Sequence, residues 1–318
     1  MKPSHWLLVF IAAWRVATQA VGLALCLGVA SLGALAQTPA EPPLANDLRE
    51  EVVRWPITLQ DASGRSENKA LVLTLFKPQG AGPFPLLVLN HGRAPTPQAR
   101  AAQRRLRYER LARFWLAQGF AVIVPTRVGY GPESEGFDPE FTGACKQPNH
   151  AVMAKATSDQ VLAAIAYAST QPDLDTTRWL VAGQSVGGFA SIATVARQPR
   201  GLLGGINFSG GTGGNPDIKP KQPCGVEFLA DFWHQQAARN TLPMLWIYWQ
   251  NDLFWGEKVP LLWHQAWLQG GGRAEFHHLP PVGNDGHNGM NLDMVHWTPL
   301  VLRFLQNLGF AAAKPVTP

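Results

Sequence analysis

The sequence has few charged residues and no internal repeat. Asp, Glu, Lys and Arg make up 15% of its 318 residues, whereas apolar residues make up 46%. A disordered chain of this length would carry more charge and fewer apolar side chains. We therefore expect a folded protein with a large core, arranged as one large domain.

No strong excess of one charge sign is present either. The chain has 27 Lys and Arg against 22 Asp and Glu, and removal of residues 1–36 would take away only Lys2 and Arg15, leaving a net charge of +3. That balance argues against a nucleic-acid partner. Basic residues do gather in 100–107, but apolar residues recur at helical spacing at Leu106, Leu111, Phe114 and Trp115, so we interpret this cluster as the solvent-facing surface of a helix.

Long hydrophobic runs are also missing. The apolar run near the amino terminus covers 21–32, which is short for a membrane span of about 20 residues. It is followed by Ala34-Leu35-Ala36, whose small residues suit a signal peptidase, so 1–36 is predicted to be a signal peptide cleaved after Ala36. An uncleaved anchor is the alternative; a lipoprotein is disfavoured because Leu25 precedes Cys26. We expect a periplasmic or secreted protein without stable membrane association after cleavage.

Only two of the three cysteines, Cys145 and Cys224, would remain after cleavage. An even count in an oxidising compartment favours a disulfide between them, and two unrelated buried thiols are the alternative. Closing a loop of this length would stabilise the fold by about 4–5 kcal/mol in the chain-entropy model. Residues 37–50, rich in Pro, Ala and Glu, are predicted to be a linker, 51–312 the folded domain, and 313–318 a tail.

Short apolar runs alternate with helical patterns along the folded domain. Strands are predicted at 54–60, 70–77, 85–90, 121–125, 179–182, 205–208, 244–249 and 274–278, and helices at 99–118, 151–170, 187–197, 228–239, 259–268 and 297–308. This alternation predicts a mostly parallel sheet covered by helices on both faces. The first two strands have no helix between them, so we expect an antiparallel edge.

A candidate nucleophile stands between a predicted strand and a predicted helix. The run Gly183-Gln184-Ser185-Val186-Gly187 follows the strand 179–182 at once and leads into the helix that starts at 187. Glycines two residues before and after Ser185 leave room for the strained turn that exposes a nucleophilic serine. The alternative is a serine that only caps the helix. The context favours the nucleophile.

A serine hydroxyl needs a base to take its proton, and in this chain order the base follows the serine. His287 lies in the glycine-rich run 283–289 between the last strand and the last helix, whereas the other histidines precede the serine or lie in predicted helices and strands. A turn histidine that only faces water is the alternative.

The third member of such a triad is a carboxylate that orients the imidazole. Asp252 follows the strand 244–249 and is our choice, with an Asx turn as the alternative role. Asp285 is the second candidate because it lies two residues from His287. Backbone N–H groups that stabilise an oxyanion are expected from Val186, which follows the serine, and from Arg93 in the loop His91-Gly92-Arg93. His91 itself is expected to brace this loop.

These motifs together resemble the dienelactone hydrolase-like branch of the α/β-hydrolase superfamily. They are Asn90-His91-Gly92, the serine run that continues to Gly188, Asn251-Asp252 and Asp285-Gly286-His287, and the resemblance covers about residues 52–310. It implies an α/β-hydrolase fold with an eight-stranded sheet, a Ser185, Asp252 and His287 triad, no metal and no diffusible cofactor. Dienelactone hydrolases use cysteine as nucleophile and this chain has serine, so the lactone substrate is not carried over.

The motifs predict a carboxylic ester hydrolase that acts on a small-molecule ester through an acyl-enzyme on Ser185. A serine peptidase of the prolyl oligopeptidase kind is an alternative, although the roughly 50 residues before the first core strands are too few for a propeller with blades of about 40 residues. A non-catalytic binding protein with the same fold is the other. Loops 137–149 and 210–224 are expected to shape the pocket, tied together by the disulfide.

Overall fold

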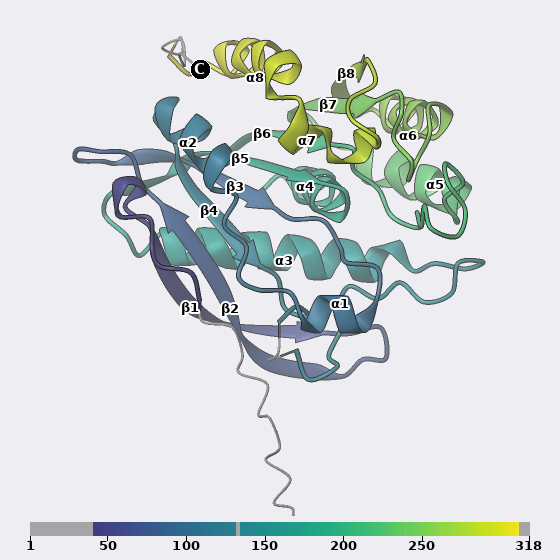
Figure 1. The fold of residues 1–318 in the computed structure, drawn as a ribbon, viewed down its shortest axis with the longest axis horizontal. Helices are drawn as coiled ribbons and strands as arrows, with labels where there is room; N and C mark the ends of the chain where they lie inside the picture. The colour runs from purple at the N-terminus through teal and green to yellow at the C-terminus, as the bar shows by residue number, and fades with distance from the viewer. Residues whose placement is uncertain (1–40, 132–133, 239, 312–318) are drawn as a thin grey trace, which may run out of the picture. The chain divides into compact units, whose positions relative to one another are not determined.

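The computed structural model describes residues 41–131, 134–238 and 240–311 of the chain (Figure 1). The predicted signal peptide 1–36 and the predicted tail 313–318 lie outside the described residues, as do the first residues of the predicted linker. Within the described part of the chain, no helix is long and apolar enough to cross a membrane.

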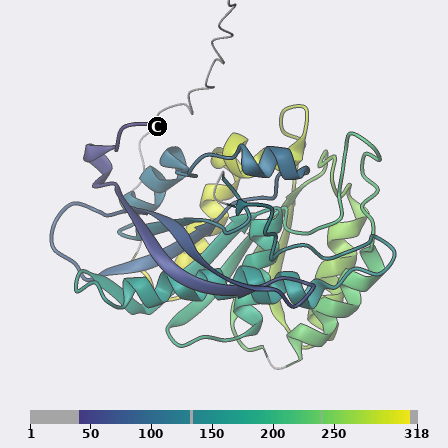
Figure 2. The same cartoon turned by 90° about the horizontal axis from the view of Figure 1, so that it is seen from below.

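Eight strands form one sheet, as the resemblance implied. Their spatial order is β1-β2-β4-β3-β5-β6-β7-β8. β1 pairs with β2 and β2 with β4 in antiparallel fashion, and every other neighbouring pair is parallel. The antiparallel edge is therefore confirmed, and Figure 2 shows the long β1 curving across it. The strands are β1 (Glu51–Gln60), β2 (Ser66–Phe76), β3 (Phe84–Asn90), β4 (Ala121–Thr126), β5 (Leu174–Gln184), β6 (Leu202–Phe208), β7 (Pro243–Trp249) and β8 (Arg273–Leu279).

Helices cover both faces because the central strands carry apolar side chains on both. Leu86 and Val88 of β3 face the core formed with helices α3, α4, α5 and α6, whereas Leu87 and Leu89 face the core formed with α2 and α8 (Figure 1). The larger helices are α2 (Glu109–Ala117), α3 (His150–Ala168), α4 (Val186–Ala196), α5 (Val226–Ala237), α6 (Lys258–Gln269) and α8 (Met294–Asn307).

One predicted helix is wrong as a continuous element. Instead of a helix over 99–118, the structure has a short α1 (Pro97–Ala101) and then α2, with 102–108 between them in a non-helical conformation. Hydrogen bonds to the sheet replace helical ones in this segment, since the backbone N–H of Leu106 donates to Thr126 Oγ1 at 2.9 Å and its carbonyl accepts from Thr74 Oγ1 at 3.0 Å. Tertiary contacts therefore override the helical pattern.

Two arginines of the basic cluster do not face solvent as expected, although Arg104 does. The side chains of Arg105 and Arg107 are 5% and 13% exposed, and both pair with the fully buried carboxylate of Glu50. Glu50 and the 3₁₀ turn η1 (Asn46–Leu48) belong to the stretch expected to be linker. The end of that stretch therefore packs on the domain, because a buried carboxylate is retained only where charged donors compensate for its lost hydration.

Candidate active site

Ser185 lies at the turn between β5 and α4 with φ 59° and ψ −125°, a region that non-glycine residues rarely adopt. The glycines two residues before and two residues after it have no room for a Cβ atom. A Cβ atom on Gly183 would lie 2.4 Å from the carbonyl oxygen of Gly187, and one on Gly187 would lie 2.3 Å from that of Asn90. The two glycines therefore make the strained turn possible and place Ser185 at the amino terminus of α4, where the helix dipole favours negative charge.

His287 and Asp252 meet above this turn. Asp252 follows β7, is fully buried, and its two carboxylate oxygens lie 3.1 and 3.0 Å from Nδ1 of His287. The carboxylate also accepts the backbone N–H groups of Phe254 at 2.8 Å and Trp255 at 3.1 Å, which fix its orientation. A carboxylate at Nδ1 favours the tautomer with its proton there, so Nε2 is left free to accept a proton.

Asp285, the second candidate for the acid, has a different task. Its Oδ1 accepts the backbone N–H groups of His287 and Leu253, each at 2.9 Å. These bonds connect the turn η3 (Gly286–Asn288), which carries His287, to the loop after β7. Asp285 therefore holds the loop that presents the imidazole, and Asp252 contacts the imidazole itself.

Ser185 and His287 open onto the same cavity, which has a volume of about 230 Å³. The loop after β3 forms another wall, and Gly92 lies so close to the nucleophile that a Cβ atom there would be 3.2 Å from Ser185 Cβ. The residues that line the cavity are His91, Gly92, Arg93, Ala94, Gln103, Leu106, Tyr108, Gln184, Ser185, Phe254 and His287. The cavity thus brings together the predicted nucleophile, the predicted base and the loop expected to supply an oxyanion donor.

His91 braces that loop and is not a second base. Its Nε2 accepts the backbone N–H of Arg127 at 3.0 Å, so Nδ1 carries the proton and donates to the carbonyl of Gly92 at 2.6 Å. Burial, together with the positive charge of Arg127, holds the pKa of His91 well below its usual value. A neutral imidazole with both nitrogens engaged cannot take a proton from Ser185.

Charged side chains behind the loop complete the bracing. Arg127 donates to the carbonyl of His91 at 2.7 Å and pairs with Glu140, and both members of this pair are fully buried. The guanidinium of Arg93 pairs with Asp138 and Glu140, and these carboxylates raise its pKa against the effect of burial. The Arg93 side chain is therefore occupied, which leaves its backbone N–H as the group expected at the oxyanion.

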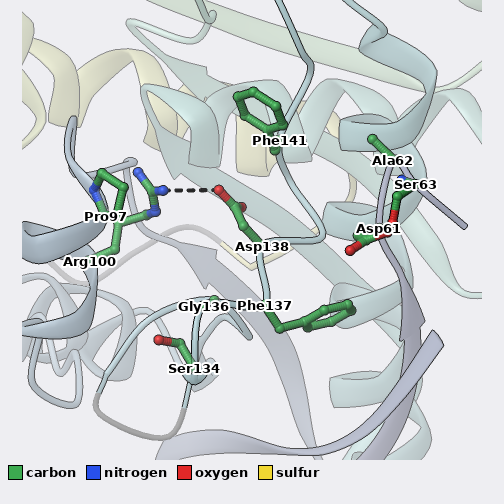
Figure 3. Close-up of a pocket in the computed structure, with 11 residues that line it drawn as sticks. Asp61, Ala62, Ser63, Pro97, Arg100, Ser134, Gly136, Phe137, Asp138 and Phe141 are labelled. Atoms are coloured by element: carbon green, nitrogen blue, oxygen red, sulfur yellow. Dashed lines mark hydrogen bonds and ion pairs between the residues drawn. The ribbon is translucent and has the colours of Figure 1, made fainter. Parts of the chain in front are cut away.

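A larger cavity, of about 380 Å³, lies beside the first but contains neither Ser185 nor His287. The turn between β1 and β2, α1, Gly129 and residues within 134–141 line it, and Figure 3 shows Arg100 paired with Asp138 in its wall. Asp138 also binds Arg93, so one carboxylate stands between the two cavities. Size alone would favour this cavity, but the described residues that line it include no histidine, so Ser185 remains our candidate nucleophile.

The structure joins Cys145 and Cys224 by a disulfide, as the sequence predicts. The bond links the loop before α3 to the loop before α5, and the backbone N–H of Cys224 donates to the carbonyl of Gly213 at 3.0 Å. Trp255 packs against Gly211 and Gly214 of this second loop and against the His287 ring, with ring centroids 5.3 Å apart. The disulfide therefore fixes a loop that reaches the base through Trp255.

Sequence reasoning missed several residues of the site. Phe254 stacks on His287 with ring centroids 3.8 Å apart, and Gln184 donates to the carbonyl of His287 at 2.7 Å. Tyr108 lines the cavity because the predicted helix is broken before it. A signal was present, since Leu106 and Leu111 are five residues apart, a spacing that one helix face does not provide.

No family model matches this sequence, and no curated protein matches it. Solved structures do resemble its fold. The acylaminoacyl peptidase of Pyrococcus horikoshii superposes with a TM-score of 0.56 at 14% identity over 84% of this chain, which spans only 43% of the peptidase. Esterase 2 of Thermogutta terrifontis gives 0.55 at 15% identity over 83% of this chain and 96% of the esterase.

A protein from Klebsiella pneumoniae assigned as a dienelactone hydrolase gives a TM-score of 0.52 at 16% identity, over 82% of this chain and the whole of that protein. Identities this low establish the arrangement of the backbone and not the reaction. Together with the strand order and the sharp turn at Ser185, they show that this chain has the α/β-hydrolase fold.

Proposed function

We propose that this protein is a serine hydrolase that cleaves carboxylic esters through an acyl-enzyme on Ser185. The observation that carries the proposal is the pairing of Asp252 with Nδ1 of His287, on a cavity that His287 shares with Ser185. A histidine held in this way accepts a proton at Nε2, and a serine on the same cavity is the group that would supply it.

The reaction would proceed in two steps of acyl transfer. His287 takes the proton of Ser185 as its oxygen attacks the ester carbonyl, and Asp252 stabilises the imidazolium that forms. The backbone N–H groups of Val186 and Arg93 would hold the oxyanion of the tetrahedral intermediate. His287 then returns the proton to the departing alkoxide. Water, activated by His287, releases the carboxylic acid and restores Ser185.

We choose ester hydrolysis over peptide hydrolysis because the sequence motifs resemble the dienelactone hydrolase-like branch. The fold does not decide between the two reactions, since an esterase and a peptidase share it. A peptidase of the prolyl oligopeptidase kind remains the alternative, and turnover of acyl esters compared with aminoacyl anilides separates the two. Faster cleavage of the anilides would reverse the choice.

The test of the nucleophile is the variant Ser185→Ala. Wild-type protein is expected to hydrolyse p-nitrophenyl esters and to be labelled by a fluorophosphonate probe, and Ser185→Ala is expected to lose both while keeping its melting temperature. Ser169→Ala, which removes an exposed hydroxyl at the end of α3, serves as the matched control and should behave as wild type. Labelling of Ser185→Ala at another serine would refute the assignment. Absence of labelling in folded, oxidised wild type would indicate a non-catalytic binding protein.

Export is part of the proposal. A signal peptide cleaved after Ala36 would deliver the enzyme to the periplasm or the medium, an oxidising setting in which the bond between Cys145 and Cys224 persists. Amino-terminal sequencing of the protein recovered from a secreting host, with Gln37 as the expected first residue, tests the cleavage.

A further inference from the structure

Tyr108 has an unusual backbone conformation at the edge of the catalytic cavity. Its φ of 51° and ψ of 42° lie in the left-handed region, where a bulky aromatic residue is rare, and as the N-cap residue of α2 it makes no side-chain cap hydrogen bond. Residues held in such conformations cluster at functional sites, because the surrounding structure must enforce them. Tyr108 is also the only tyrosine among the residues that line the cavity of Ser185 and His287 in the described structure.

The preceding residues enforce this conformation from several sides. Leu106 is hydrogen-bonded to Thr126 and Thr74 of the sheet, and Arg105 and Arg107 are both paired with the buried Glu50. Side chains on both sides of Leu106 are therefore anchored, so the chain must turn sharply before α2 can begin. The turn places Tyr108 against the loop that follows β3 and not on the outer surface of a continuous helix.

The surroundings of the Tyr108 hydroxyl suit a hydrogen-bond donor. Burial raises its pKa to about 12, so the phenol keeps its proton at neutral pH. The nearby backbone N–H of Gly92 opposes part of this rise in pKa. Among the described residues no protein group accepts the hydrogen of this hydroxyl, so the hydrogen can be donated to a substrate in the cavity. Gly92 lies against Ser185 Cβ and lines the same cavity, so Tyr108 borders the space next to the nucleophile and the loop after β3.

We propose that Tyr108 is a further catalytic residue, whose hydroxyl donates a hydrogen bond to the oxyanion formed when Ser185 attacks the substrate carbonyl. The inference rests on the proposed serine hydrolase function and adds a side-chain donor to the backbone N–H groups of Val186 and Arg93. Tyr108 keeps its proton throughout, since His287 carries out both proton transfers. Its contribution is stabilisation of the negative charge that develops on the carbonyl oxygen.

The variant Tyr108→Phe tests this role, since it removes one oxygen and keeps the ring. Loss of one oxyanion donor typically lowers kcat by about 10²-fold, and we expect a loss of that order with KM little changed. Inhibition by a boronic acid, whose adduct with Ser185 carries the same negative charge, should weaken by a similar factor. Tyr167→Phe is the matched control, because Tyr167 packs at its edge against Trp55 in the core and does not line the cavity.

The Tyr108 hydroxyl could donate either to the oxyanion or to the oxygen of the leaving alcohol. The dependence of the kcat loss on the leaving group distinguishes these two roles. A donor to the oxyanion lowers kcat by the same factor for p-nitrophenyl and alkyl esters, whereas a donor to the departing alkoxide would be needed far more by the alkyl esters. The second pattern would overturn the assignment. Wild-type kcat and wild-type boronate affinity in Tyr108→Phe would also overturn it, leaving Tyr108 as part of the cavity wall.

A replacement of Tyr108 by 3-fluorotyrosine covers the case in which Tyr108→Phe does not fold. This residue keeps the ring and the hydroxyl but ionises more readily, so a donating phenol predicts that kcat falls at lower pH on the alkaline side of the profile. An unchanged profile would refute the donation. Loss of fluorophosphonate labelling in wild type would instead refute the serine hydrolase function itself, so the two failures are distinguishable.

Discussion

At the residue scale, two aspartates near His287 divide the work of positioning it. Asp252 contacts the ring at Nδ1, and Asp285 binds the backbone N–H of the same residue and that of Leu253. One carboxylate therefore acts on the charge and tautomer of the imidazole, and the other on the position of its loop. The two roles predict different results for the same change of side chain.

Asp252→Asn should lower kcat by about 10³–10⁴-fold for p-nitrophenyl esters, because an amide does not enforce the tautomer or stabilise the imidazolium. Asp285→Asn keeps an oxygen that accepts the two backbone N–H groups, so we expect less than a tenfold loss and a small drop in melting temperature. Steady-state kinetics of the two variants side by side checks the assignment. A larger loss in Asp285→Asn would exchange the two roles.

The residue scale is also where sequence reasoning worked best and where it stopped. Ser185, Asp252 and His287 could be proposed because each follows a strand in a glycine-rich or polar run, which is a local pattern. Tyr108, Phe254 and Glu140 could not, because their contacts join segments that are distant in sequence. Phe254 has no pattern that predicts its stacking on His287.

At the scale of elements, the loop after β3 depends on the loop after β4. Arg127 binds both the carbonyl and, through its backbone N–H, the ring of His91, and Glu140 neutralises Arg127. Arg93 belongs to this loop, so the same support holds the backbone N–H that we propose for the oxyanion. Arg127 and Glu140 therefore position the proposed oxyanion site, although neither of them lines the cavity.

Glu140→Gln tests this support. It leaves the fully buried guanidinium of Arg127 without its countercharge, which should cost about 3 kcal/mol in the free energy of unfolding. We also expect kcat to fall more than KM rises, because the loop holds the oxyanion and not the ground-state ester. Chemical denaturation and steady-state kinetics measure the two effects.

Glu227→Gln on the exposed face of α5 is the control and should change the free energy of unfolding by less than about 0.5 kcal/mol. Wild-type kinetics in Glu140→Gln would show that the loop keeps its position without the network.

The break between α1 and α2 shows why an element can be predicted wrongly by a sound pattern. Residues 99–118 have helical periodicity in their second half. Periodicity cannot predict the ion pair of Arg105 with Glu50, which lies 55 residues earlier in the chain and holds the Arg105 side chain away from solvent. The other predicted strands and helices are local apolar runs, and each overlaps an element of the structure. The misread segment is the one that brings Tyr108 to the cavity.

At the scale of the whole molecule, the parallel sheet explains how residues distant in sequence reach one cavity. β3, β5, β7 and β8 run in the same direction, so the loops after them leave from the same edge. These loops carry Arg93, Ser185, Asp252 and His287. The fold class predicts this gathering, since ligands of open α/β sheets bind outside the carboxyl ends of the strands. It does not predict the shape of the cavity, which depends on the conformations of the loops that line it, and no residue of the expected pocket loops 137–149 and 210–224 is among these lining residues.

Stability of the whole domain should fall in mild acid because of His150. This first residue of α3 is buried near Phe189 and Phe232, and neither ring nitrogen has a hydrogen-bond partner in the described structure. Burial lowers its pKa from 6.5 to about 4. Between about pH 6.5 and pH 4, His150 is therefore protonated in the unfolded chain and neutral in the folded chain. The free energy of unfolding is highest above pH 6.5 and declines as the pH falls towards 4.

The shift of His150 corresponds to about 3 kcal/mol between those pH values, at about 1.4 kcal/mol for each pKa unit. His150→Phe removes the titrating group and keeps an aromatic ring between its neighbours, so its free energy of unfolding should decline less steeply between pH 6.5 and 4. His234→Gln, at an exposed position of α5, is the control and should follow wild type. Denaturant titrations at several pH values give the slopes. Parallel curves for wild type and His150→Phe would mean that His150 is not the source, and the buried His91, whose pKa is also lowered, would be the next histidine to replace.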